Sequence, residues 1–143
     1  TSGAHSPDSL AGAGSPHVRI EEFLPHDPVI ERASVVVCHG GMGITQRALY
    51  RGVPVVVVPF GRDQPEVARR VEHAGAGVRL AAGGLSDSSL AAAVRRATTM
   101  REGAARVGSA LAEAGGNAAA ADAFCELLAD EPAAEKALPS AGH

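Results

Sequence analysis

The hydrophobic positions of this chain fall into short continuous runs separated by stripes of helical period. A continuous β-branched run stands at residues 35–37, and a second predicted strand over residues 53–58 is all valine apart from Pro54 near its start; both are typical of strands buried on both faces of a parallel sheet. The segments that follow carry apolar residues every three or four positions, as in helices that pack by one side. Strands that alternate with helices in this way predict an α/β fold, a parallel sheet flanked by helices.

The remaining elements are expected on similar grounds. Val18 and Ile20 alternate with polar residues and are followed by Phe23, which predicts a strand over residues 17–23. Asp27 would cap a short helix that ends near residue 32. The other expected elements are helices over residues 45–51 and 65–74, a third strand over residues 77–80, and three helices that follow Ser86.

Capping residues set the expected ends of these helices. Gly52 stands where a left-handed residue would end the helix over residues 45–51, Ser86 would cap the first of the three later helices, and Asn117 would cap the last one. The last helix would bury Ala120, Ala121, Phe124, Leu127 and Leu128.

One domain accounts for most of the chain. Residues 1–16 are rich in Ser, Gly, Ala and Pro without periodicity and are expected to form a flexible segment. Residues 17–129 carry all the predicted elements, and residues 130–143 are expected to be a frayed tail. The 143 residues lie within the usual size of a single domain.

Composition narrows the functional classes. The formal net charge of −3 gives no footprint for nucleic-acid binding, and no apolar run approaches the roughly 18 residues of a membrane span. Two cysteines, Cys38 and Cys125, are too few for a disulfide framework and lack metal-ligand spacing. We therefore expect reduced cysteines in a cytoplasmic protein without a bound metal, with Cys38 a small core residue at a strand end.

The chemistry is expected where two predicted strands end, because ligands of parallel α/β sheets sit beyond the carboxyl ends of the strands. After the first strand come His39, Gly40, Gly41 and Gly43. Glycines allow positive φ angles and close approach of a ligand, and the amides of residues 43–45 would point outward at the positive end of a helix dipole. A diphosphate is the expected guest, and the alternative is a glycine turn that only allows tight packing.

The sequence does not fit other glycine-containing motifs that bind phosphates or hydrolyse esters. The Walker pattern needs a lysine after the glycines, and the only lysine is Lys136. The dinucleotide fingerprint would need glycine where Gln46 stands. An esterase reading of the His-Gly-Gly sequence would need a Gly-x-Ser-x-Gly elbow, which the sequence lacks.

The second loop, residues 60–64, ends in Asp63 and Gln64. A carboxylate beside an amide can bond to several adjacent hydroxyl groups, as a sugar ring presents them. Alternatively, Asp63 caps the following helix, with Pro65 near its start. The two roles can coexist, because a carboxylate has more than one acceptor position.

Taken together, the blocks between residues 23 and 64 resemble the donor-binding signature of inverting family-1 glycosyltransferases with the two-domain GT-B architecture. The matching blocks are Phe23-Leu24-Pro25-His26, the loop from His39 to Thr45, Gly52-Val53-Pro54, and Asp63-Gln64. The His-Gly-Gly form of the loop is similar to that of bacterial members that glycosylate natural-product aglycones, such as macrolides, aromatic polyketides and enediynes. The resemblance covers residues 18–128 and implies a Rossmann-like half of a GT-B enzyme.

The resemblance also implies roles for individual residues. His39, Gly40, Gly41, Gly43, Ile44 and Thr45 would hold the diphosphate of a UDP or TDP sugar, Phe23 and His26 would lie at the nucleobase, and Asp63 and Gln64 would contact the sugar. His39 would also act in catalysis, by stabilising the diphosphate as it leaves. Phe23 replaces the tryptophan of plant members, and Arg47 stands where these carry a ribose-binding glutamate, so the ribose contact is not carried over.

For the whole enzyme, the family implies sugar transfer with inversion to a hydroxyl of a small-molecule acceptor. It implies no obligatory metal or other cofactor, the nucleotide sugar being a substrate. The general base belongs to the family's N-terminal acceptor domain, which this sequence lacks. We therefore expect the chain to be inactive alone and to need that domain, from the same gene or a separate chain.

Two further interpretations compete with this one. A non-catalytic interaction domain could use the same nucleotide fold, although it would have no need of His39 or of Asp63 and Gln64. A standalone donor module that works with a separate acceptor subunit would keep all of these residues. The first differs from a donor domain in its affinity for nucleoside diphosphates.

Overall fold

The computed structural model describes residues 17–130, so the predictions for residues 1–16 and 131–143 lie outside the described part. The helices and strands occur in the order α1 (His26–Ile30), β1 (Val36–Cys38), α2 (Met42–Tyr50), β2 (Val55–Val57), α3 (Gln64–His73), β3 (Gly77–Arg79), a 3₁₀ turn (Ala82–Gly84), α4 (Asp87–Thr98), α5 (Arg101–Glu113) and α6 (Gly116–Asp130). This is the predicted α/β alternation.

The three strands form one parallel sheet with the order β1-β2-β3. The register pairs Cys38 with Val57 and Val57 with Arg79, so the three strands end at the same edge. The central strand β2 is buried along its whole length, as its continuous run of valines predicts. The loops that leave β1 and β2 are therefore neighbours.

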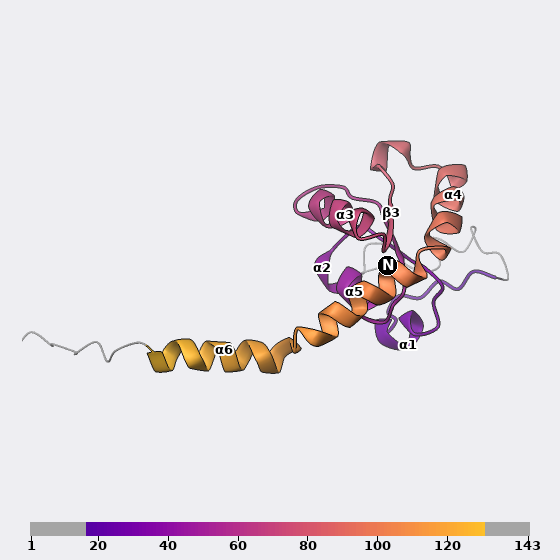
Figure 1. The fold of residues 1–143 in the computed structure, drawn as a ribbon. Coiled ribbons are helices and arrows are strands. Elements are labelled where there is room, and N and C mark those ends of the chain that lie inside the picture. The colour runs from indigo at the N-terminus through magenta and orange to yellow at the C-terminus, as the bar shows by residue number, and fades with distance from the viewer. Residues whose placement is uncertain (1–16, 131–143) are drawn as a thin grey trace, which may run out of the picture.

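Helices cover both faces of the sheet (Figure 1). Val55 and Val57 point into a core formed with α2, α3 and α5. Val56, between them, points to the other face and packs with Val78 and with Ala93 and Ala97 of α4. Successive side chains of a strand point to opposite faces, so the unbroken valine run serves both layers.

The predicted strand over residues 17–23 is wrong. The chain there is irregular, and Val18 is 53% exposed and Phe23 82% exposed. Among the described residues, no strand pairs with the free edge of β1, and Ile20 is the only apolar residue of this segment that is even partly buried. Two alternating apolar residues without a surface to cover do not specify a strand.

Glycine and serine end or begin helices as expected at two positions. Gly52 follows α2 with a φ of 66°. The Ser86 hydroxyl oxygen accepts a hydrogen bond from the Ser89 amide, and the Ser89 hydroxyl oxygen accepts one from the Ser86 amide, which makes a capping box at the start of α4. Both predictions are confirmed.

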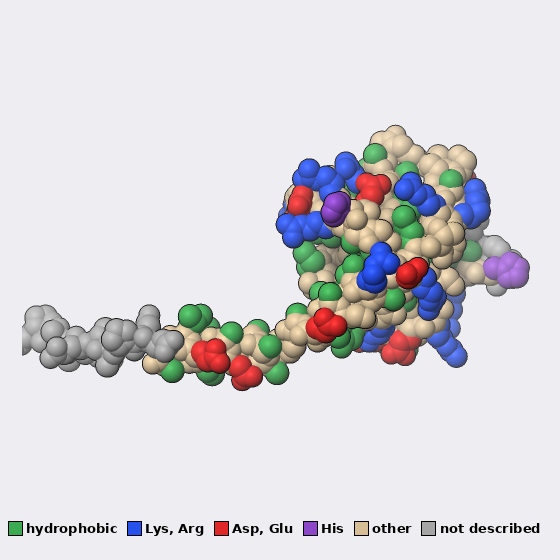
Figure 2. All heavy atoms as spheres, viewed as in Figure 1, with side chains coloured by type: hydrophobic (Ala, Val, Ile, Leu, Met, Phe, Trp, Pro, Cys, Tyr) green, Lys and Arg blue, Asp and Glu red, His purple; other side chains and the backbone are tan. Residues whose placement is uncertain are grey.

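The expected burial of α6 is wrong. This helix extends away from the body of the protein (Figure 1), and all its side chains up to residue 129 are exposed, including Phe124, Leu127 and Leu128. Figure 2 shows hydrophobic side chains along its surface. Asn117 lies inside the helix, which begins at Gly116, and so does not cap it.

Candidate functional site

The two predicted loops meet at the carboxyl edge of the sheet. Gly40, just after β1, lies so close to the second loop that a Cβ atom there would stand 2.7 Å from Cγ1 of Val57 and 3.3 Å from the carbonyl oxygen of Gln64. The structure thus brings the His39 loop against the start of α3. This contact joins the two halves of the predicted site.

The three glycines of the first loop have three different roles. Gly40 takes a φ of 91°, which only glycine adopts readily. Gly41 has an ordinary φ of −61° and is the N-cap of α2, and a Cβ there would stand 2.6 Å from Nε2 of His39. A Cβ on Gly43 would meet no atom within 4 Å. The packing interpretation therefore holds for Gly40, whereas Gly43 leaves open space beside the backbone.

Helix α2 begins at Met42, three residues earlier than predicted. The amides with no acceptor inside the helix are consequently those of Met42, Gly43 and Ile44. The prediction that the Thr45 amide points outward as the third donor is wrong, because this amide donates to the carbonyl of Gly41 (3.2 Å). The amide of Met42 is instead one of the three that lack an acceptor within the helix, because α2 begins at that residue.

The Thr45 side chain is also unavailable to a ligand. It is 2% exposed, its hydroxyl donates to the carbonyl of Gly41 (2.9 Å), and it lies 3.7 Å from the sulfur of Cys38. Thr45 therefore fixes the first turn of α2 from the inside. Cys38 is a partly buried neighbour of the core, as predicted.

His39 lies at the exposed surface of this edge. Its imidazole ring lies across Gly41, since both Nε2 and Cε1 are within 3.0 Å of a Cβ built there. The ring is therefore held beside the first turn of α2. An imidazole N–H and the free amides of the helix can act on one anion.

Asp63 and Gln64 follow β2 at the same edge. Asp63 is in the N-cap position of α3, but its side chain makes no capping hydrogen bond, so the exposed carboxylate is open to other partners. Oε1 of Gln64 accepts hydrogen bonds from the amides of Phe60 (2.8 Å) and Gly61 (3.2 Å). The side-chain carbonyl of Gln64 therefore holds the loop in shape, and the NH₂ of the same amide group is left for a ligand.

That loop contains a left-handed residue. Arg62 has a φ of 58°, the only positive value for a non-glycine residue in the part of the chain described. This conformation is uncommon for side chains with a Cβ. The two hydrogen bonds to Gln64 close the turn around it and set the position of Asp63.

Phe23 and His26 line one hollow of about 620 Å³, with Arg47 on its α2 side. The rest of its wall comes from Glu21, Glu22, Leu24 and Pro25. The predicted nucleobase residues are thus brought together beside the helix that carries the free amides. The sequence pattern carries no ribose contact over to Arg47, and the structure places this residue in the wall of the hollow.

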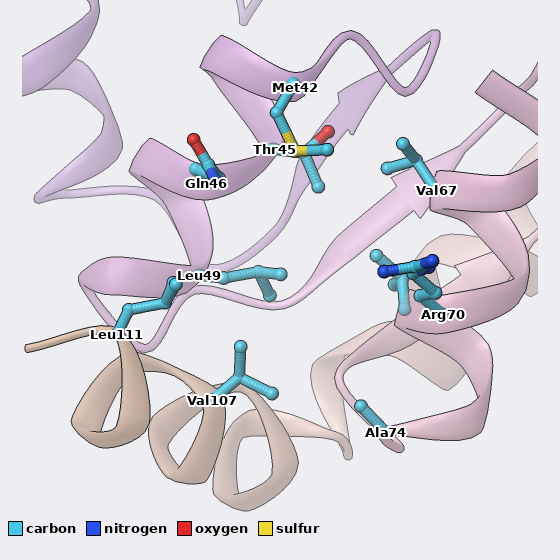
Figure 3. Close-up of a pocket in the computed structure, with 10 residues that line it drawn as sticks. Met42, Thr45, Gln46, Leu49, Val67, Arg70, Ala74, Val107 and Leu111 are labelled. Carbon is cyan, nitrogen blue, oxygen red and sulfur yellow. The ribbon is translucent and has the colours of Figure 1, made fainter. Parts of the chain in front are cut away.

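A second hollow, of about 370 Å³, lies between α2, α3 and α5 (Figure 3). Its walls are mostly apolar, with Leu49, Val67 and Val107 facing one another and the Arg70 guanidinium at the side. Of the predicted site residues only Thr45 borders it, and its hydroxyl is bonded to Gly41. This cavity offers few polar groups and is not suited to a diphosphate.

Charges elsewhere on the described chain do not extend the site. On α3, a hydrogen bond from Arg70 and the charge of Arg69 hold the pKa of Glu66 below its usual range, and the carboxylate is paired with both arginines. Within residues 17–130 no cluster of three His, Cys, Asp or Glu side chains could hold a metal ion. No helix in this range is long and apolar enough to cross a membrane.

Comparison with known proteins connects this site with a family. Residues 5–128 match the C-terminal domain of proteins like erythromycin biosynthesis protein CIII. The chain is 38% identical over 112 residues to the uncharacterized UDP-glucosyltransferase YojK of Bacillus subtilis (strain 168), covering 76% of this chain and 28% of YojK.

Two solved structures show the same fold. The calicheamicin glycosyltransferase CalG4 superposes with a TM-score of 0.80 at 30% identity, over 89% of this chain and 34% of CalG4. The glycosyltransferase VinC, solved in complex with dTDP, superposes with a TM-score of 0.68 at 26% identity, over 73% of this chain and 28% of VinC. The chain thus spans about a third or less of each of these proteins. It belongs to the family of erythromycin biosynthesis protein CIII-like C-terminal domains, which are C-terminal domains of GT-B glycosyltransferases.

Proposed function

We propose that this chain is the donor-binding part of an inverting glycosyltransferase, which takes a sugar from TDP or UDP and transfers it to a hydroxyl of a natural-product aglycone. The observation that carries the proposal is the arrangement of three features on one sheet edge. The start of α2 with its free amides lies beside His39, the Phe23 hollow borders the same helix at Arg47, and Gly40 packs against Gln64, the neighbour of Asp63.

The diphosphate would bind at the start of α2. The amides of Met42, Gly43 and Ile44 point along the helix axis, where the dipole favours an anion. Gly43 has no side chain that would keep a phosphate oxygen from these amides. Gly40 and Gly41 act indirectly, since they allow the loop to turn and His39 to lie beside the helix.

The nucleoside and the sugar would extend in opposite directions from the diphosphate. The hollow lined by Phe23 and His26 offers an aromatic ring and an imidazole to a nucleobase. On the other side, the Asp63 carboxylate accepts hydrogen bonds from sugar hydroxyls and the Gln64 NH₂ donates one. The name of YojK and the bound dTDP of VinC support a uridine or thymidine diphosphate donor.

The proposed chemistry requires little from this chain beyond electrostatics. The acceptor hydroxyl attacks the anomeric carbon on the face opposite to the diphosphate, the bond to the diphosphate breaks, and a base takes the hydroxyl proton. Negative charge grows on the departing diphosphate. His39 and the α2 amides would stabilise that charge as it develops, which lowers the barrier as well as aiding binding.

We propose further that the base and the acceptor site belong to an N-terminal domain. In support, the chain spans 28% of YojK and 34% of CalG4. The purified chain should then release no glycoside from a mixture of nucleotide sugar and aglycone. Robust transfer by the chain alone would contradict this part of the proposal.

Calorimetric titration with TDP and with UDP tests the donor site itself. The chain should bind at least one of the two, and His39→Ala should weaken binding about tenfold, the effect of one charge-assisted hydrogen bond. Arg96→Gln on α4, on the other face of the sheet, is the matched control and should bind as the parent does. If neither nucleotide binds, an interaction domain is the better interpretation.

A further inference from the structure

The hollow between α2, α3 and α5 has a floor made of the protein core. Leu49, Val67 and Val71 are each no more than 6% exposed, and all three belong to one hydrophobic cluster. Val107 and Leu111 of α5 form the wall opposite α3 (Figure 3). The space of about 370 Å³ lies within the range of small-molecule pockets, roughly 300–1,000 Å³.

One cation borders this apolar space. The guanidinium of Arg70 lies at its side (Figure 3), and the other residues of the wall are uncharged. Within residues 17–130, the Arg70 side chain makes one hydrogen bond, from Nε to Oε1 of Glu66 at 3.0 Å. Its two terminal NH₂ groups therefore have no acceptor in the described chain. Because Glu66 also pairs with Arg69, one carboxylate serves two guanidinium groups, and one positive charge is left over.

The remaining polar groups of the wall add little to a binding site. The Thr45 hydroxyl already donates to the carbonyl of Gly41 at 2.9 Å, which leaves the exposed Gln46 at the surface. A ligand in the hollow would therefore meet valine and leucine side chains over most of its surface and the Arg70 guanidinium at one end.

This arrangement selects one kind of molecule. A polar body would lose its hydrogen bonds to water against the apolar walls, and an ammonium group would be repelled by the guanidinium. A carboxylate, in contrast, has two oxygens that match two NH₂ groups of one guanidinium. We propose that the hollow is a second binding site, which takes a small molecule with an apolar body and one ionised carboxylate. The proposal is independent of the donor site.

Decanoate and decanol test this proposal, because they share the length of their carbon chain and differ in the charge at its end. In methyl NMR spectra of the full 143-residue chain, decanoate should shift the signals of Leu49, Val67 and Val107. It should bind about tenfold more tightly than decanol, the effect of a charge-assisted hydrogen bond. Arg70→Met keeps an apolar side chain but removes the cation, and should lower the affinity for decanoate to that for decanol.

Arg69→Met is the matched control, since Arg69 also pairs with Glu66 but does not line the hollow. This variant should bind decanoate as the parent does. Equal affinity of the parent for decanoate and decanol would overturn the proposal, and so would an unchanged affinity for decanoate in Arg70→Met or no shift at millimolar decanoate.

Two further outcomes would overturn the proposal in favour of another occupant or another surface. Shifts confined to Leu127 and Leu128 would mean that decanoate only adsorbs to the exposed side chains of α6. Signals of Val67 and Val107 that change with protein concentration in the absence of decanoate would mean that a second copy of the chain covers the hollow.

Discussion

The imidazole of His39 lies across the α-carbon of Gly41, so that a Cβ at position 41 would stand 2.6 Å from Nε2 of the histidine. Gly41→Ala should therefore displace the ring from the start of α2. The backbone angles of Gly41 suit alanine, but alanine is a poorer N-cap than glycine, so we expect the free energy of unfolding to fall by about 1 kcal/mol. Affinity for a nucleoside diphosphate should fall about tenfold in calorimetric titration.

Gly61→Ala is the control for that variant, because a Cβ on Gly61 meets nothing within 4 Å. It should fold and bind as the parent chain does. Unchanged affinity in Gly41→Ala would mean that the position of His39 does not matter to the donor.

Gly43→Ala should separate stability from binding. Alanine is favoured over glycine in a helix, and the new methyl group meets no atom of the protein, so the free energy of unfolding should rise by up to about 1 kcal/mol. The same methyl group would stand where a phosphate oxygen must approach the amides. Stability in denaturant unfolding should therefore rise, whereas affinity in nucleotide titration should fall. A variant that binds as well as the parent would exclude a close approach of the phosphate to Gly43.

Gln64 has two functions that two substitutions can separate. Gln64→Glu keeps an acceptor for the amides of Phe60 and Gly61 but loses the NH₂ group. We expect the free energy of unfolding of this variant to stay near that of the parent. Its affinity for a nucleotide sugar should no longer exceed its affinity for the nucleotide without the sugar. Gln64→Leu removes the acceptor and should cost about 1–2 kcal/mol of unfolding free energy.

Equal stability of the two Gln64 variants in denaturant unfolding would show that these loop hydrogen bonds do not matter to the fold. A nucleotide sugar that binds to Gln64→Glu as tightly as to the parent would remove the residue from the sugar contact. Each outcome thus tests one function alone.

The pairing of Glu66 with Arg69 and Arg70 should give a small pH dependence. The pKa of Glu66 is lowered in the folded chain, first by the hydrogen bond from Arg70. Its stabilising contribution is therefore present above the unfolded-state pKa and is lost as the pH falls through the folded value. The Tm difference between the parent and Glu66→Gln should be present at neutral pH, shrink with added salt, and disappear in acid.

Features of the fold that depend only on residues close together in the sequence were predictable from it. The valines of β2 are apolar on both faces, so their burial required only that helices cover both sides, and Ser86 capped α4 through residues three positions away. The start of α2 was misplaced because glycines suggest a turn, whereas Gly41 takes extended angles and caps a helix that already contains Gly43. Because of this error of three residues, the sequence predicted a free amide at Thr45, whereas the structure has it at Met42.

The errors at the two ends of the domain have a common physical reason. Periodicity tells which residues share a face but not whether a surface exists to cover that face. In α6 the residues Phe124, Leu127 and Leu128 have no cover within the described chain, and Val18 likewise lies open. The meeting of the two loops was predictable because they follow neighbouring strands, whereas the place of Arg47 depended on how α1 packs.

The most direct test of the account is an NMR titration of the ¹⁵N-labelled chain with TDP and with UDP. The account predicts that the largest amide shifts occur at residues 40–44, with a second group at Phe23, Leu24, His26 and Arg47, and that His39→Ala weakens the response. Shifts confined to Leu49, Val67 and Val107, which line the apolar cavity between α2, α3 and α5, or no shifts at millimolar nucleotide, would contradict it.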